Sequence, residues 1–225
     1  MTVVYVLADL SQANRVARAG ANLVRRVDAY HTLLAGRSDW DCPRGWAFHD
    51  AESAREAFGH ALPAWTSTTT QLVHIAPAPG DWHALYAGVV GSISDPRVAP
   101  YAIVTSEDVA TIAGHELTHH LRAFRNTPPG AEWFEEGFCF GVPRQQILAP
   151  RRLAAVTAAE AALTEAYAAR LGTTEVWSFG ANDDGSGWPA ALYDYAGDPW
   201  AALTAFEAWN ERHRHTPLAE WLGVR

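Results

Sequence analysis

The sequence predicts an α+β fold, in which a mixed α/β N-terminal half with a small sheet precedes a mainly α-helical C-terminal half. Runs of β-branched residues typical of strands occur in the first half of the chain. Beyond Pro128 and Pro129, apolar residues recur almost throughout at helical spacing. The 225 residues suffice for one domain with a sizeable core. We therefore expect a single domain, 1–225, made of an α/β lobe at 1–105 and a helical lobe at 106–225.

In the N-terminal half, strand-like runs alternate with segments of helical spacing. Ser11 and Asp50 can cap the two helices, since their side-chain oxygens suit a helix start. Pro77 and Pro79 end the middle strand, because proline donates no backbone hydrogen bond. The predicted elements are a strand at 2–10, a helix at 11–34, a loop at 37–46, a helix at 50–62, and strands at 71–80 and 99–106.

A helix at the junction of the two lobes opens the C-terminal half. Thr105 and Asp108 have the spacing of a capping box, which predicts that this helix begins at about Ser106. Further helices are expected at 131–148, 151–171, 189–196, 199–213 and 217–223.

Composition excludes several classes of function. The net charge is -8, from 17 basic and 25 acidic residues with no basic run, which argues against a nucleic-acid partner. No segment reaches the roughly 18 apolar residues that a membrane span needs, and no basic segment precedes an apolar run as in a secretory leader. Cys42 and Cys139 lack the spacing of a disulfide framework, so we expect free thiols in a cytoplasmic protein.

The stretch "TIAGHELTHHL", 111–121, contains the strongest motif. His115 and His119 are four residues apart, so on a helix both imidazoles lie on one face and can bind one cation. Glu116 completes the pattern H-E-x-x-H, which pairs two zinc-binding histidines with a glutamate general base. The neighbouring His120 points about 100° away from His119, so we expect it outside the metal group.

A catalytic zinc site needs a third protein ligand and an open position. A third histidine in the longer pattern HExxHxxGxxH is excluded, because Arg122 and Arg125 occupy its glycine and histidine positions. A downstream carboxylate on a second helix remains, and "AEWFEEGFCFGV" supplies Glu135 and Glu136.

The segments "GHELTHHL" and "EWFEEGFC" resemble the gluzincin metallopeptidases, the superfamily of thermolysin and the aminopeptidase-N-like enzymes. "WFEEGFC" is similar to the "WLxEGFA" segment of the aminopeptidase-like branch, in which the glutamate directly before glycine is the third zinc ligand. That register implies Glu136, with Glu135 as the alternative. The resemblance covers only Val109 to Val142.

The resemblance implies one Zn²⁺ per chain, bound by His115, His119 and Glu136, and hydrolysis of peptide bonds in a peptide or protein substrate. A metal-activated water would attack the peptide carbonyl, with Glu116 as general base. The family also binds substrate along an edge strand, for which "QLVHIA" and "YAIVTS" are the two candidates, and Trp133 is a candidate for the wall of the site.

The oxyanion formed during hydrolysis needs a further hydrogen-bond donor. Tyr193 and Tyr195 lie where the aminopeptidase-like branch has such a tyrosine, although neither has the family spacing to the next glycine, and packing in an aromatic core is an equal alternative. We favour Tyr195. His213 and His215 are a thermolysin-like alternative.

Two other functions fit the motif. One is a regulatory metallopeptidase that cleaves a single protein partner, but the sequence shows no docking module. The other is a non-catalytic, peptidase-like binding protein, in which zinc is structural or absent. The general base Glu116 argues against it, because a binding module needs no base beside its metal.

Overall fold

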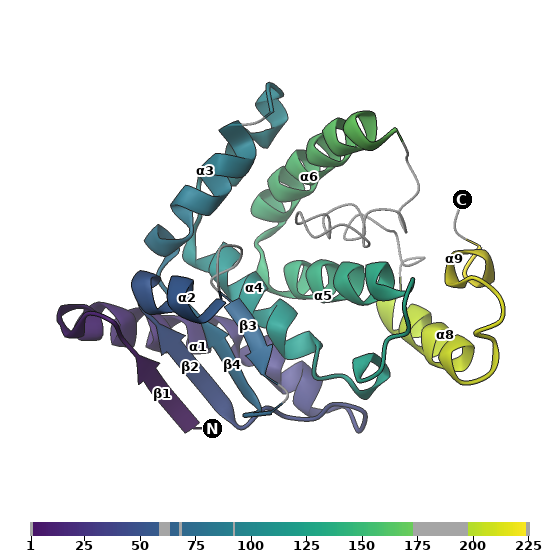
Figure 1. The fold of residues 1–225 in the computed structure, drawn as a ribbon, viewed down its shortest axis with the longest axis horizontal. Helices are drawn as coiled ribbons and strands as arrows, with labels where there is room; N and C mark the ends of the chain where they lie inside the picture. Colours follow the sequence, from purple (N-terminus) through teal and green to yellow (C-terminus); the bar gives the residue numbers. More distant parts are fainter. Residues whose placement is uncertain (1, 59–63, 68, 92, 173–197, 224–225) are drawn as a thin grey trace.

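The computed structural model describes residues 2–58, 64–67, 69–91, 93–172 and 198–223, and it has the predicted α+β fold (Figure 1). The strands are β1 (Thr2–Val6), β2 (Gly45–His49), β3 (Ala64–Ser67) and β4 (Leu72–Ile75). The helices are α1 (Ala13–Ala35), α2 (Ala51–Phe58), α3 (His83–Gly91), α4 (Ser106–Thr118), α5 (Glu132–Ile147), α6 (Pro150–Leu171), α8 (Pro199–Arg212) and α9 (Leu218–Trp221). Short 3₁₀ helices are η1 (Leu10–Gln12), η2 (Pro79–Asp81), η3 (Pro96–Ala102) and η4 (Arg122–Phe124).

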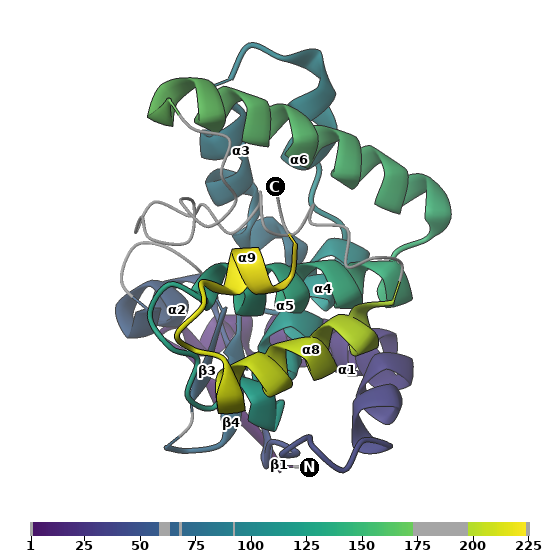
Figure 2. The same ribbon diagram turned by 90° about the vertical axis from the view of Figure 1, so that its right-hand side faces the viewer.

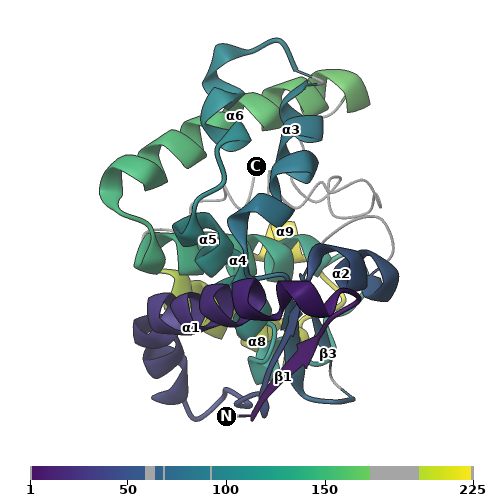
Figure 3. The ribbon, with the colours of Figure 1, turned by 90° about the vertical axis from the view of Figure 1, so that its left-hand side faces the viewer.

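The strands form one mixed sheet in the order β1-β2-β4-β3. β1, β2 and β4 are parallel, whereas β3 pairs antiparallel with β4. Helix α1 connects β1 to β2 and lies across one face of the sheet (Figure 3). Its Gly20 permits this approach, because a Cβ atom there would lie 2.4 Å from the Phe48 ring.

Helix α4 lies in the middle of the molecule, between α1 and α5 (Figures 1 and 2). The main hydrophobic cluster joins side chains of α1, the sheet, α4, α5 and α8, so it draws on both halves of the chain. At its centre, the rings of Phe134 in α5 and Phe206 in α8 stack at 4.7 Å. The metal motif thus sits on a helix that is buried almost throughout.

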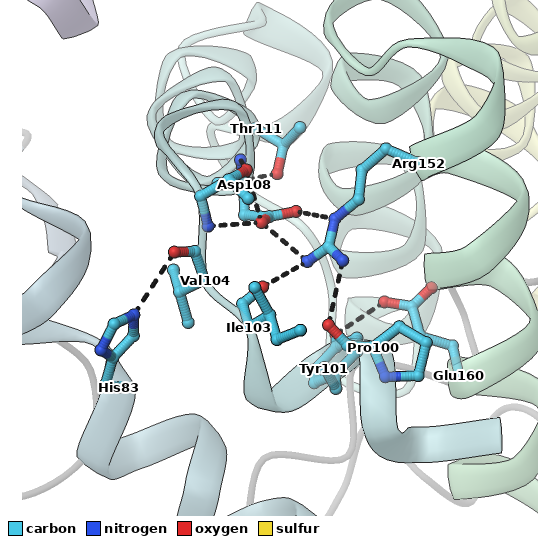
Figure 4. A network of polar contacts seen from close by, with 10 residues as sticks. His83, Pro100, Tyr101, Ile103, Val104, Asp108, Thr111, Arg152 and Glu160 are labelled. Atoms are coloured by element: carbon cyan, nitrogen blue, oxygen red, sulfur yellow. Dashed lines mark hydrogen bonds and ion pairs between the residues drawn. The ribbon is translucent and has the colours of Figure 1, made fainter. Parts of the chain in front are cut away.

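A second hydrophobic cluster joins η3 to α6, with Tyr101, Val156 and Leu163 among its members. It lies on the far side of α4 and α5 from the sheet (Figure 1). Arg152 of α6 ties this unit to the start of α4, since its guanidinium donates to both carboxylate oxygens of Asp108 at 2.8 and 2.7 Å (Figure 4). Asp108 also closes the predicted capping box with Thr105, which is confirmed.

Several expected elements are present with small changes of bounds. The strand expected at 71–80 is shorter, and the helices expected at 11–34, 131–148, 151–171, 199–213 and 217–223 correspond to α1, α5, α6, α8 and α9. Asp50 caps α2 as predicted, because its Oδ1 accepts from the Ser53 N–H at 2.8 Å. Ser11 does not cap α1. It lies inside η1, where Asp9 accepts its N–H.

The strand predicted at 99–106 is wrong. Residues 96–102 form η3 instead, because Pro96 starts the turn and Pro100 lies within it, and neither can donate to a sheet. β2, β3 and α3 were not predicted. β2 begins at Gly45, inside the expected loop at 37–46.

The expected helix at 189–196 lies outside the described residues. Among the helices that are described, none is both long and apolar enough to cross a membrane.

Two histidines meet between adjacent strands. His49 of β2 and His74 of β4 approach to 3.1 Å between Nε2 and Nδ1. His49 is only 2% exposed. Burial, reinforced by His74, lowers the pKa of His49 to about 4, while Asp50 acts in the opposite direction. Burial also lowers the pKa of His74. Both rings are therefore neutral in the folded protein at neutral pH.

This pair should make stability depend on pH. Between pH 6.5 and about 4, these two histidines bind more protons in the unfolded chain, where imidazole pKa values lie near 6.5, than in the folded chain, so their contribution to stability falls as the pH falls. Between pH 7 and 4.5 we expect wild type to lose about 2 kcal/mol more than His49→Gln, at about 1.4 kcal/mol per pKa unit. Urea unfolding at both pH values measures this. Equal losses in the two proteins would contradict a neutral His49.

Candidate metal centre

The two motif histidines come together at the C-terminal end of α4. His119 directly follows the last residue of the helix but keeps helical backbone angles, φ −57° and ψ −16°. The helical path therefore continues from His115 to His119, as the spacing predicts. Their Nε2 atoms are 3.0 Å apart.

Helix α5 brings a carboxylate to the same point. Glu136 places Oε2 3.5 Å from Nε2 of His115, and Oε1 3.8 Å from Nε2 of His119. One donor atom from each of the three residues lies within 4.8 Å of the other two, and no other such group occurs in the described ranges. The structure thus unites the three residues that the sequence predicts as ligands.

The neighbouring carboxylate has a different contact. Oε1 of Glu135 lies 2.7 Å from Nδ1 of His119, on the other side of the imidazole from Nε2. When Nδ1 carries the proton and donates it to Glu135, the lone pair of Nε2 is directed at the donor group. The geometry therefore favours Glu136 as the ligand and Glu135 as the group that orients His119.

His115 is held in another way. Its ring packs on Phe140 at 4.1 Å, and the guanidinium of Arg144 lies over that phenyl ring at 4.9 Å. Its Nδ1 is buried and has no hydrogen-bond partner among the described residues. Burial, with help from His119 and Arg144, lowers the pKa of His115 well below its usual value. The ring is therefore neutral, the form in which imidazole binds metal.

The donor set fits zinc. Two imidazole nitrogens and one carboxylate are a known catalytic zinc set, and tetrahedral bonds of about 2.0–2.1 Å would separate the donor atoms by about 3.3 Å. The two Nε2 atoms are 3.0 Å apart, and the two oxygens of Glu136 lie 3.5 Å from His115 and 3.8 Å from His119, respectively, which is close to this value. Cys139 is no rival ligand. Its Sγ lies 3.6 Å from Nδ1 of His119, and burial raises the pKa of the thiol to about 12, so it stays protonated.

Glu116 is the fourth functional group at the site. It is 8% exposed, and burial raises its pKa to about 7. Glu136 raises this pKa further, while His119 and hydrogen bonds from Thr66 lower it. A carboxyl group with a pKa near neutrality can both accept a proton and return it at physiological pH.

Close packing of α4 on α5 permits this arrangement. A Cβ atom at Gly114 would lie 2.7 Å from Cβ of Pro143 and 3.1 Å from Cδ1 of Ile147. Only glycine lets α5 approach the turn of α4 that precedes His115.

Side chains from outside α4 fix its last turn. The indole N–H of Trp40 donates to the carbonyl of Leu117 at 2.9 Å. The hydroxyls of Tyr30 and Thr118 are 2.7 Å apart, and Thr118 in turn donates to the carbonyl of Gly114 at 2.6 Å. The backbone that carries both histidines is therefore anchored to α1 and to the segment after it.

Of the other predicted site residues, those that the structure describes lie outside this group. Tyr193 and Tyr195 lie outside the described residues. His213 stacks on Trp221 at 4.2 Å, next to His215 at 6.0 Å. Nε2 of His120 instead approaches the hydroxyl of Thr66 at 3.4 Å. Trp133 is 1% exposed and packs edge-on against Phe134, so it belongs to the core.

Both edge-strand candidates are wrong. "QLVHIA" contains β4, which is paired on both sides by β2 and β3. "YAIVTS" is not a strand, as described above for 99–106. Among the described strands, the sheet edge beside α4 is β3. It has only four residues, and its Trp and Thr were its sole sequence signal. Phe140 was also missed, although its position four residues after Glu136 predicts that it shares the same helix face.

Comparison with known proteins adds no relative, since no family model matches the chain and no curated protein or solved structure resembles it at a significant level. The family resemblance therefore depends on the motif residues and on the geometry of their side chains.

Replacing each of the two adjacent glutamates by glutamine should show how much each contributes to zinc affinity. We expect Glu136→Gln to weaken zinc binding at least about 100-fold, because a ligand loses its charge. Glu135→Gln should lower zinc affinity only about tenfold, since its amide oxygen can still accept the hydrogen bond from His119. Competition with a chromogenic chelator measures both, with His119→Ala as a variant that should lose the ion. A larger loss in Glu135→Gln would reverse the assignment.

Gly114→Ala should destabilise the protein by about 1–3 kcal/mol and weaken zinc binding, because the new Cβ atom pushes α4 and α5 apart. Gly88→Ala in α3 is the matched control. No atom lies within 4 Å of a Cβ at Gly88, so alanine there should leave zinc affinity unchanged. It should raise the free energy of unfolding by about 0.5–1 kcal/mol, because alanine favours a helix more than glycine does. Thermal and urea unfolding compare the two. Equal stability of both variants would show that α4 does not need glycine at 114.

Proposed function

We propose that the protein is a zinc metallopeptidase of the gluzincin type. The observation that carries this proposal is the convergence of His115, His119 and Glu136 on one point, with the buried Glu116 near enough for His119 and Glu136 to act on its pKa. A ligand group with a base next to it is the minimum that metal-assisted hydrolysis requires. A structural zinc site would have no use for that base.

His115, His119 and Glu136 would hold the ion, and Glu135 would keep His119 in the tautomer that binds it. When bound, zinc supplies a Lewis acid for the peptide carbonyl and lowers the pKa of water. The carboxylate of Glu116 takes the proton of the attacking water and returns it to the leaving amine nitrogen. Its pKa of about 7 suits both transfers.

Strand β3 supports a substrate role for this part of the surface. It is the edge of the sheet, and its Thr66 contacts α4 directly at Glu116. An extended peptide could add to this edge through main-chain hydrogen bonds and present its carbonyl groups along α4. The sequence predicted that the segment 71–76 or 101–106 would be the substrate-binding edge strand, and we now assign that role to β3.

The hydrogen-bond donor to the oxyanion is proposed from the sequence alone. Tyr195 is preferred, followed by Tyr193, with His213 and His215 as the alternative. Cys42 and Cys139 are both free thiols, which supports the reducing environment of the cytoplasm. The proposed substrate is a peptide or protein, and each chain would bind one zinc ion.

The decisive test is Glu116→Gln in the zinc-loaded protein. We expect zinc content and affinity to stay within about twofold, because Glu116 is outside the donor group, while peptide hydrolysis falls about 10²–10⁴-fold through loss of the base. Hydrolysis of a mixed peptide library, followed by mass spectrometry, measures the activity.

Treatment with a strong chelator should abolish hydrolysis by the wild-type protein, and stoichiometric zinc should restore it. Wild-type turnover in Glu116→Gln, or turnover that survives chelation, would contradict the proposed mechanism.

A further inference from the structure

The carbonyl of the general base has an unusual hydrogen-bond partner. At the end of α4 the hydrogen-bond pattern changes to that of a 3₁₀ turn, because the N–H of His120 donates to the carbonyl of Leu117, three residues back, at 3.2 Å. The carbonyl of Glu116 is instead taken by a side chain from the sheet. The hydroxyl of Thr66 in β3 donates to it at 3.0 Å, across 50 residues of sequence.

Thr66 also reaches the carboxyl end of the same residue. Burial raises the pKa of Glu116, and hydrogen bonds from the backbone N–H and the hydroxyl of Thr66 oppose this shift. A hydroxyl has one proton and serves one acceptor at a time. That proton lies on the carbonyl oxygen, so the hydroxyl of Thr66 is committed to the backbone of Glu116.

The position of Thr66 makes this contact rigid. Its partner in the ladder is Val73 of β4, so the backbone of Thr66 is fixed by the sheet. Threonine is β-branched, and this restricts its side-chain rotamers in a strand. The hydroxyl is half-buried between β3 and α4, with Nε2 of His120 as its other neighbour at 3.4 Å.

We propose that Thr66 is a positioning residue for the general base, which couples the edge strand of the sheet to the carboxylate of Glu116. Its hydroxyl fixes the backbone carbonyl of Glu116 and thereby the part of the last turn of α4 that carries the carboxylate. The inference rests on the proposed peptidase function and adds a residue that no ligand or base pattern contains. It also implies that a peptide paired with β3 lies next to the residue that orients the base.

Thr66→Val removes the hydroxyl with little change of shape, and Thr66→Ser keeps it. In Thr66→Val we expect kcat to fall roughly 10- to 100-fold, with KM and zinc affinity within about twofold of wild type. Thr66→Ser should retain most of kcat. Thr69→Val, at an exposed turn position, is the control for a threonine-to-valine change and should be silent. Wild-type kcat in Thr66→Val, or loss of zinc from it, would overturn the proposal.

A kinetic double-mutant cycle separates positioning from general damage. If Thr66 acts through Glu116, Thr66→Val should lower kcat roughly 10- to 100-fold in the wild-type background. In the Glu116→Gln background it should lower kcat less than about twofold. Equal losses in both backgrounds would show that Thr66 supports the structure rather than the base.

A structural readout keeps this inference separate from the proposed function. In crystal structures without substrate, the carboxylate of Glu116 should be displaced by about 0.5 Å or more in Thr66→Val but not in Thr66→Ser. An unmoved carboxylate would refute the role of Thr66, whether or not the protein hydrolyses peptides. Absence of peptide hydrolysis in the wild type, with a displaced carboxylate in Thr66→Val, would refute the peptidase function alone.

Discussion

Helix α5 packs directly against α4 at Gly114, where any side chain would collide with Pro143. This contact sets the distance between the two helices, and through it the position of Glu136 relative to His115 and His119. Because metal donor atoms must lie within a few ångströms of one another, a small separation of the helices would disperse the group. The glycine next to the first histidine therefore matters to the centre as much as the ligands do.

The electrostatics of the site are unfavourable without a cation. Burial raises the pKa of both Glu116 and Glu136, which shows that the surroundings disfavour their charged forms. The two Nε2 atoms are 3.0 Å apart, and the pKa of His119 is raised well above its ordinary value, chiefly by Cys139 and Glu135 against the effect of burial, so without a metal a proton lies between the two rings. A divalent cation at this point would stabilise the carboxylate and both nitrogen donors together. The protein thus keeps a locally costly cluster where a metal would offset the cost, as functional sites commonly do.

Both ends of α4 are held by polar contacts from distant parts of the chain. At its start, Arg152 clamps Asp108 of the capping box. At its end, Trp40 and Thr66 bind the carbonyls of Leu117 and Glu116. These bonds restrict rotation and sliding of the helix, so His115 and His119 keep their orientation toward Glu136 of α5. Rigid support of this kind is what a preorganised catalytic group requires.

The sequence by itself determined the features that depend on local geometry. The four-residue spacing places His115 and His119 on one helix face in any fold, and the capping box sets the start of that helix. The choice between Glu135 and Glu136 was suggested by a family register, but only the packing of α4 on α5 decided their contacts. The edge strand could not be found from pattern, because strand order is a property of the whole sheet and β3 has only four residues. The contact of Thr66 likewise arises from tertiary structure, since its hydrogen bond joins residues 50 positions apart.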